Sequence, residues 1–283
     1  MKQLKERGMK VVFLLAACTS IMAVALICVF LFTNGFSAIG KIGVLDFLFG
    51  GKWKPLNDIY GIFPMILGSI YVTGGAILAG VPIGLLCAVF LAEFCPPALY
   101  RIVKPAVDLL AGIPSVVYGF FGLVVIVPIM QNLFGGSGKS MLTASLLLGL
   151  MILPTIIGVA ESAIRAVPRS YYEGALALGA TRERSVFAAV LPAAKSGVLA
   201  GVVLGIGRAI GETMAVIMVA GNQAMMPQGL LRGVRTMTAN IVLEMGYAVD
   251  LHREALIATA VVLFVFILII NLSFSLLKRG EKA

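Results

Sequence analysis

Residues 196–221 read SGVLAGVVLGIGRAIGETMAVIMVAG, an apolar run that holds two charges, Arg208 and Glu212. About 20 apolar residues suffice for a helix to cross a bilayer, so this run predicts a transmembrane helix. Charged side chains at membrane depth cost about 2.5–3.5 kcal/mol each on insertion scales, and they usually line a path or a cavity. Residues four apart share one helix face, so these two can pair. The pair then either lines the route of a polar solute or joins two helices structurally.

The rest of the chain has the composition of a helical membrane protein. Of its 283 residues, 60% are hydrophobic and 12% are charged, whereas soluble domains carry about 25% charged residues. We therefore expect an all-α membrane protein, in which the net charge of +9 reflects topology rather than nucleic-acid binding. Apolar runs predict six transmembrane helices, at residues 11–32, 62–92, 109–130, 141–160, 196–221 and 255–277.

The first of these runs has features of a signal peptide, namely a basic start and an Ala23-Val24-Ala25 triplet. The apolar run continues to Phe32, whereas the apolar region of a signal peptide is only about 7–15 residues long. We expect a retained transmembrane helix.

The distribution of Lys and Arg predicts the orientation. With the N-terminus inside, the inner segments hold 14 of the 22 Lys and Arg residues and the outer loops hold seven. Because cytoplasmic loops are enriched in these residues, we expect a multi-pass protein with both termini in the cytoplasm. Trp53 and Tyr60 are then expected to anchor the chain at the outer membrane interface.

Other polar motifs indicate no cofactor on this chain. The segment GGSGKS at residues 135–140 ends like a phosphate-binding loop, but Leu133 stands where that motif needs glycine. His252 is the single histidine, and no cysteine lies near it, so a metal site is not expected. The cysteines form no CxxC pair and are expected to be free: Cys18, Cys28, Cys87 and Cys95.

Small residues recur at four-residue spacing and predict close helix packing. One row lies in the fifth predicted span with a second row beside it, and another lies in the second span. They are Gly197, Gly201 and Gly205; Gly207 and Gly211; and Ala76, Gly80, Gly84 and Ala88.

The predicted inner loop at residues 161–195 contains EGALALG at residues 173–179, followed by Leu191-Pro192. This spacing resembles the EAA loop of ABC importer permeases, with Gly174 in place of the usual second alanine. The resemblance implies a type I ABC importer permease fold and a cytoplasmic coupling helix that docks an ATPase. The helix is expected at residues 171–178, ended by Gly179 in a left-handed conformation. The matching residues are Glu173, Ala175, Gly179, Leu191 and Pro192.

Four further segments resemble the phosphate branch of these permeases, the PstC type, to which the PstA type is similar. They are FLFG at 47–50 with Trp53, GIPSVVYG at 112–119, GRAIGETMA at 207–215 and RTMTANI at 235–241. The resemblance implies a permease core at residues 62–283, preceded by an N-terminal helix and outer loop at residues 1–61. It also implies a location in the bacterial inner membrane, a homologous PstA-like permease, a PstB-like ATPase dimer that binds ATP and Mg²⁺, and an extracytoplasmic PstS-like phosphate-binding protein.

The resemblance also gives the polar residues of the apolar spans a role in phosphate transport, without covalent chemistry by this chain. Arg208 can bind the anion through bidentate hydrogen bonds, and Glu212 can compete for the same guanidinium and make binding transient. Ser115, Tyr118 and Thr213 either donate hydroxyl groups to the path or pack helices together.

Two other functions fit parts of the pattern. A permease for another oxyanion, such as sulfate or molybdate, keeps the EAA loop and changes the path residues. A secondary transporter can use an intramembrane ion pair but needs no such loop. An intramembrane enzyme lacks a nucleophile–His pair within the spans.

Overall fold

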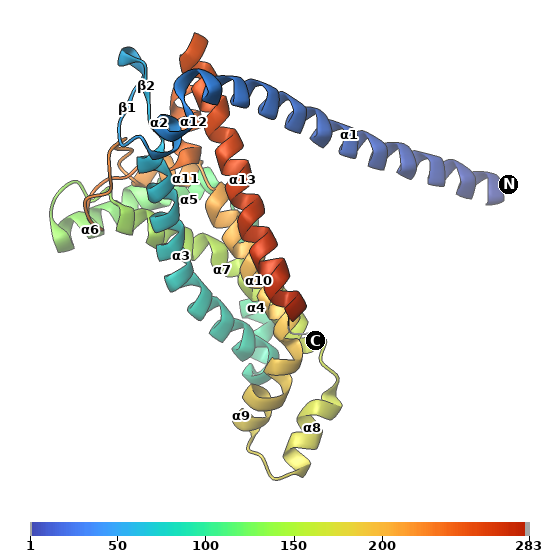
Figure 1. The fold of residues 1–283 in the computed structure, drawn as a ribbon. Coiled ribbons are helices and arrows are strands. Elements are labelled where there is room, and N and C mark those ends of the chain that lie inside the picture. Colours follow the sequence, from blue (N-terminus) through green and yellow to red (C-terminus); the bar gives the residue numbers. More distant parts are fainter. Residues whose placement is uncertain (1, 281–283) are drawn as a thin grey trace.

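Helices account for nearly all of the secondary structure in the computed structural model, which describes residues 2–280 and the side chains of residues 9–273 (Figure 1). Two short strands, β1 (Trp53–Lys54) and β2 (Ile59–Tyr60), pair antiparallel around a 3₁₀ turn, η1 (Pro55–Asn57). Three π-helical segments, in which one turn is widened, are η2 (Phe90–Phe94), η3 (Gly122–Ile126) and η4 (Val186–Val190). The α-helices are α1 (Lys2–Ile42), α2 (Val44–Phe49), α3 (Phe63–Val89), α4 (Pro97–Gly112), α5 (Ser115–Phe121), α6 (Val127–Phe134), α7 (Met141–Arg165), α8 (Arg169–Ala177), α9 (Arg182–Ser185), α10 (Leu191–Gly211), α11 (Met214–Val219), α12 (Met237–Glu244) and α13 (Asp250–Gly280).

Six helical segments of the described chain are long and apolar enough to cross a membrane, which confirms the predicted number of spans. They run Met9–Ile42, Phe63–Phe94, Ser115–Phe134, Met141–Arg165, Arg182–Gly211 and Asp250–Ser273. The chain is therefore a multi-pass helical membrane protein.

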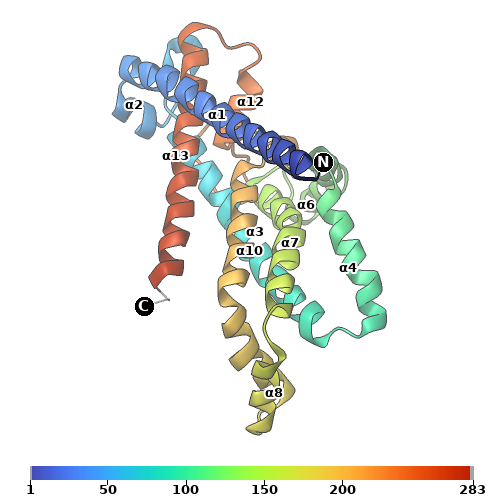
Figure 2. The ribbon, with the colours of Figure 1, turned by 90° about the vertical axis from the view of Figure 1, so that its right-hand side faces the viewer.

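Helix α7 occupies the centre of the bundle, with α3 and α10 packed along it (Figure 2). Small residues permit this packing. A Cβ atom added to Gly80 on α3 would lie 2.8 Å from the Gly149 carbonyl oxygen, and one added to Gly201 on α10 would lie 3.2 Å from Val159 Cβ. The predicted small-residue rows on α3 and α10 thus line the contacts of these two helices with α7. Gly207 and Gly211 instead face open space.

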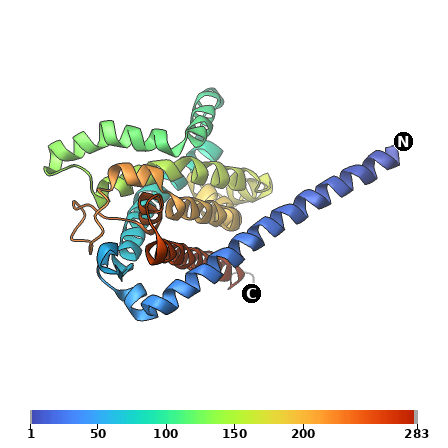
Figure 3. The ribbon, with the colours of Figure 1, turned by 90° about the horizontal axis from the view of Figure 1, so that it is seen from above.

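The N-terminal part of helix α1 projects away from the bundle, and its C-terminal part contacts α13 (Figures 1 and 3). Its contact region includes Phe32, whose ring lies 5.8 Å from that of Phe264, and Lys41, whose Nζ lies 2.6 Å from Glu254 Oε2. Between Met9 and Phe30 the side chains of α1 are mostly apolar and exposed. The helix is longer than the predicted span at residues 11–32.

The two ends of the bundle differ, and we name them by their contents: the α8 end holds α8 and α9, and the hairpin end holds β1, β2 and α12. Trp53 and Tyr60 are buried at the hairpin end rather than anchored at a membrane interface, so that prediction is wrong. Trp53 Nε1 donates to Glu244 Oε2 at 2.8 Å, and His252 Nε2 lies 2.9 Å from the same oxygen. The Trp53 indole is buried with the Glu244 carboxylate, because a buried carboxylate needs hydrogen-bond donors and the indole N–H is one of them.

The third predicted span begins later than expected, because the chain breaks before it. Helix α4 ends at Gly112 and α5 starts at Ser115, with Ile113 extended between them at ψ 127°. Proline disfavours the helical conformation of the preceding residue, so Pro114 accounts for this break. Residues 109–112 therefore belong to α4, an amphipathic helix with no buried residue.

Candidate functional site

A second break interrupts the apolar run at residues 196–221, where a continuous helix was predicted. Helix α10 ends at Gly211, Glu212 is extended at φ −68° and ψ 131°, and α11 starts at Met214. Glu212 Oε1 accepts hydrogen bonds from the backbone N–H groups of Thr213 at 3.0 Å and Ala215 at 3.1 Å. A carboxylate at this place satisfies N–H groups that lack a partner within the helix. Glu212 thus caps α11 inside the bundle.

The other side of this break is held by α12. The Thr238 hydroxyl donates to the Glu212 carbonyl oxygen at 3.1 Å, and the Thr236 and Thr238 hydroxyl oxygens lie 3.0 Å apart. Unwound backbone at membrane depth is tolerated only where protein or a water-filled cavity surrounds it. The break between α10 and α11 is therefore stabilised by its own hydrogen bonds.

Arg208 lies in the last turn of α10, four residues before Glu212. Its Nη1 donates to Thr155 Oγ1 on α7 at 3.4 Å, in the central part of that helix. Among the described side chains Arg208 and Glu212 form no ion pair, so the predicted pairing is not present. The reason is geometric: Glu212 has left the helix, so the four-residue spacing no longer places both side chains on one face. A cation at the end of α10 is instead favoured by the helix dipole.

The predicted hydroxyl groups surround this break but mostly have partners. Tyr118 Oη donates to the Leu110 carbonyl oxygen at 2.9 Å, and Thr213 Oγ1 donates to the Gly211 carbonyl oxygen at 3.1 Å. Ser115 is the first residue of α5 and is half-buried.

Close packing joins α5 to α11 beside the break. A Cβ atom added to Gly119 would lie 2.9 Å from Ala215 Cα and 2.7 Å from Met218 Sδ. Thr155 was not predicted to belong to this site. The available signal was a hydroxyl residue directly after Pro154, in the middle of an apolar span.

Helix α8 projects from the opposite part of the molecule, beyond the ends of α7 and α10 (Figure 1). It has no buried residue, and Leu178 at its end is 92% exposed. Gly179 has φ +85°, as predicted, and its N–H donates to the Leu176 carbonyl oxygen at 2.9 Å. The Ala180 N–H donates to the Ala175 carbonyl oxygen at 3.1 Å, which completes a glycine-dependent helix stop.

The remaining motif residues flank this projection. Glu173 lies on the exposed surface of α8, and Leu191-Pro192 form the first two positions of α10 after η4. Within the described side chains, no group of three or more His, Cys, Asp or Glu residues is arranged to hold a metal ion.

Together these features define a class of protein. A helical bundle whose fifth apolar span ends in unwound backbone inside the bundle, with an arginine beside it, is typical of membrane transport permeases. The chain matches the family described as "Binding-protein-dependent transport system inner membrane component" over residues 80–282.

Named relatives agree with this family over most of their length. A probable ABC transporter permease protein, YqgH of Bacillus subtilis, is 38% identical over 95% of this chain and 91% of the relative. The phosphate transport system permease protein PstC of Mesorhizobium japonicum is 35% identical over 85% of this chain and 80% of the relative. The chain therefore belongs to the binding-protein-dependent transport system inner membrane component family, on its PstC branch.

Solved structures support the same fold. The MetNI methionine ABC transporter in inward-facing conformations matches with a TM-score of 0.64 and 20% identity, over 81% of this chain and 99% of the other. A bacterial transporter that imports alginate matches with a TM-score of 0.60 and 16% identity, over 85% and 89% of the two chains. The fold is that of type I ABC importer permeases, and the chain is a component of an ABC transporter with other subunits.

Proposed function

We propose that this chain is the permease subunit of an ATP-driven importer of inorganic phosphate, and that it forms the translocation path with a homologous PstA-like permease. PstC permeases are among its relatives at 34–35% identity. The observation that carries the proposal is the position of Arg208, beside a broken helix in the central part of the bundle.

The chemistry of Arg208 suits a phosphate ion. A guanidinium offers several N–H donors in a planar fork, and it binds phosphate through paired, charge-assisted hydrogen bonds. Thr155 occupies Nη1 at 3.4 Å, which is a long hydrogen bond that an anion can replace. Ser115, at the start of α5, is a candidate for an additional neutral donor.

The two ends of the bundle suit different partners. The exposed α8, with Glu173, Ala175 and Gly179, is the site for a PstB-like ATPase dimer, and this end faces the cytoplasm together with both termini. The hairpin end faces an extracytoplasmic PstS-like phosphate-binding protein. ATP and Mg²⁺ bind to the ATPase subunits, and this chain performs no covalent chemistry.

The test is ATP-dependent uptake of labelled inorganic phosphate by proteoliposomes that contain the assembled transporter. We expect Arg208→Gln to lower uptake by at least about tenfold, because a hydrogen bond to a charged group contributes about 1.5–3 kcal/mol. Arg253→Gln is the matched control, since Arg253 is exposed and distant in the fold, and it should leave uptake unchanged.

Competition distinguishes this function from its alternatives. Unlabelled phosphate should abolish the uptake, and sulfate or molybdate at the same concentration should not. Equal competition by sulfate would assign the chain to another oxyanion, and uptake that continues without ATP would indicate a secondary transporter.

A further inference from the structure

We propose that Glu161 is a positioning residue that transmits movement of α8 to the helix break at Glu212. It does so by holding α4 and η2 against the end of α7. The inference rests on the proposed function in one respect, namely that α8 contacts the ATPase.

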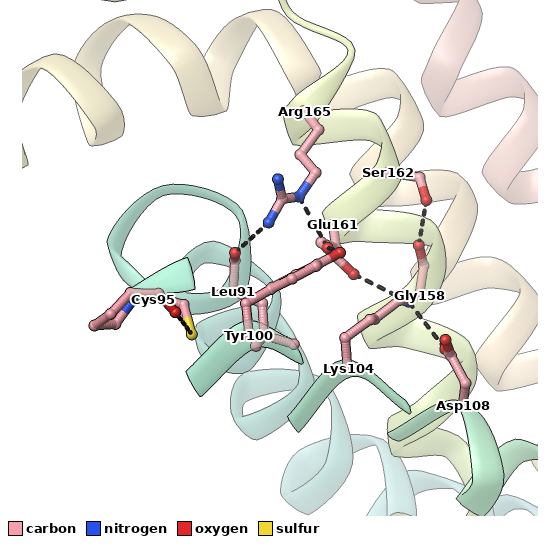
Figure 4. A network of polar contacts seen from close by, with 10 residues as sticks. Leu91, Cys95, Tyr100, Lys104, Asp108, Gly158, Glu161, Ser162 and Arg165 are labelled. Atoms are coloured by element: carbon pink, nitrogen blue, oxygen red, sulfur yellow. Dashed lines mark hydrogen bonds and ion pairs between the residues drawn. The ribbon is translucent and has the colours of Figure 1, made fainter. Parts of the chain in front are cut away.

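The carboxylate of Glu161 joins two helices at the α8 end (Figure 4). It is 2% exposed, and Oε1 accepts from Tyr100 Oη at 2.6 Å and from Arg165 Nε at 2.9 Å. Oε2 lies 3.1 Å from Lys104 Nζ, which also lies 2.9 Å from Asp108 Oδ1. Tyr100 and Lys104 both belong to α4, so this helix is attached to α7 through one buried group. Its removal releases both contacts together.

Tyr100 and Lys104 on α4 keep the protons with which they contact Glu161. The hydrogen bond to Glu161, with burial, raises the pKa of Tyr100, so its hydroxyl keeps the proton that it donates. Burial alone would lower the pKa of Lys104, but its ion pairs with the Asp108 and Glu161 carboxylates outweigh it and raise that pKa. Both groups therefore hold their protons at neutral pH.

Arg165 extends the joint to the end of the second span. Its Nη2 donates to the Leu91 carbonyl oxygen at 2.7 Å, and its guanidinium lies 4.3 Å from the centre of the Tyr100 ring. Leu91 belongs to η2, whose last carbonyl groups have no partner further along the helix. The segments α4, α7 and η2 thus meet at Glu161 and Arg165.

The same η2 segment is connected to both sides of α8. Arg169, the first residue of α8, places Nη1 3.2 Å from Glu93 Oε2, and Arg182, the first residue of α9, donates to the Glu93 carbonyl oxygen at 2.5 Å. Glu93 is only 7% exposed. A force on α8 therefore reaches η2 through two arginines, and reaches α4 through Arg165 and Glu161.

The far end of α4 leads to the break. The Leu110 carbonyl oxygen accepts the Tyr118 hydroxyl at 2.9 Å, which ties α4 to α5 across the bend at Pro114. Helix α5 packs on α11 at Gly119, and α11 begins after Glu212. A continuous series of packed helices thus links Glu161 to the helix break.

The test uses the assembled transporter with a cysteine-free version of this chain and one reporter, Val117→Cys, on the exposed side of α5. The rate of thiol labelling is measured with and without ATP. We expect ATP to change this rate by about fivefold or more, the lower range of coupling between sites, and Glu161→Gln to remove that change. Tyr100→Phe, which loses one hydrogen bond, should reduce it.

The controls separate transmission from folding. Glu254→Gln makes the same chemical change in the Lys41 ion pair at the hairpin end and should keep the full ATP response. Glu161→Gln leaves Lys104 with Asp108 and Arg165 with Leu91, so assembly is expected. If the Glu161→Gln transporter does not assemble, the ATP response of the Tyr100→Phe transporter tests the proposal.

Two results would overturn the proposal: a parent transporter whose labelling does not respond to ATP, or a full response in Tyr100→Phe and in any assembled Glu161→Gln transporter. A purely structural Glu161 predicts lower yield with an unchanged response. The labelling needs no transported solute, so a parent that fails to import phosphate contradicts the proposed function alone.

Discussion

Glu212 and Arg208 serve two different helix ends, although only four residues separate them. Arg208 lies in the last turn of α10, where partial negative charge gathers, and Glu212 precedes the first turn of α11, where partial positive charge gathers. Each charge is thus partly compensated by peptide dipoles. This explains how the chain keeps two ionisable groups at membrane depth without pairing them.

Variants of Glu212 test its role as a helix cap. Glu212→Gln keeps an oxygen that can accept from Thr213 and Ala215, so we expect stability and uptake close to the parent. Glu212→Ala removes the acceptor and should lower the free energy of unfolding by about 0.5–2 kcal/mol. Thermal unfolding in detergent measures the difference.

The double variant Arg208→Gln, Glu212→Gln separates the cap from an ion pair. Because Arg208 and Glu212 have different partners, the double variant should transport as poorly as Arg208→Gln alone. Recovery of uptake in the double variant would restore the ion-pair interpretation and remove Arg208 from the path.

The sequence could identify Arg208 and Glu212 because the cost of an intramembrane charge depends on composition alone. It could not identify Thr155 as the partner of Arg208, since that contact depends on how α7 and α10 are rotated against each other. The cap made by Glu212 was hidden for a related reason: a cap has meaning only once the end of the helix is known.

Among the elements, α8 depends on one glycine. Gly179 has φ +85°, a conformation that a β-branched residue does not adopt without strain. We expect Gly179→Val to disturb the helix stop and to reduce binding of the ATPase by at least about fivefold, on the basis of about 1–2 kcal/mol for a left-handed residue. Copurification of the ATPase measures it.

The control for that variant is Gly174→Ala, in the same helix. Gly174 has no left-handed conformation, and an added Cβ meets nothing within 4 Å, so ATPase binding should be kept. Normal transport and complex formation by Gly179→Val would exclude α8 as the coupling helix.

Packing of α3 on α7 is a second element that one residue can test. A side chain on Gly80 would meet the Gly149 carbonyl oxygen and Ile152, whereas one on Gly74 meets nothing within 4 Å. Gly80→Val should lower the free energy of unfolding by about 1–3 kcal/mol, the usual range for overpacking. Gly74→Val makes the same substitution in the same helix without a packing clash. An equal loss of stability in both variants would mean that the helix propensity of valine, and not packing at Gly80, is responsible.

The number of spans was predictable from hydropathy, but several of their boundaries were not, and two of these lie at breaks in the backbone. Backbone groups freed at the breaks find tertiary partners: Thr238 donates to the carbonyl of Glu212, and Tyr118 donates to that of Leu110. These partners lie far along the chain or across a bend, so the average hydropathy of neighbouring residues stays high through both breaks and does not reveal them. Pro114 offered a local signal for the first break, whereas nothing as direct marked Glu212.

For the whole molecule, the two ends differ in charge and in construction. The α8 end concentrates arginines around α8 and η2, including Arg165, Arg169 and Arg182. At the hairpin end, Arg235 and His252 are largely occupied with Glu244. The arginines at the α8 end thus hold the coupling segment and also follow the positive-inside rule.

This asymmetry predicts the orientation in the membrane, which single cysteines can test. Arg184→Cys at the α8 end and Lys52→Cys at the hairpin end are both exposed positions, and each is placed in a chain without its four native cysteines. With 14 of 22 Lys and Arg residues on the predicted inner side, we expect an impermeant thiol reagent to label position 52 in intact cells and position 184 only after lysis. Both variants must first support phosphate uptake, which shows that the charge changes have not altered insertion. Labelling of position 184 in intact cells, with position 52 protected, would invert the molecule and place α8 where no ATPase can reach it.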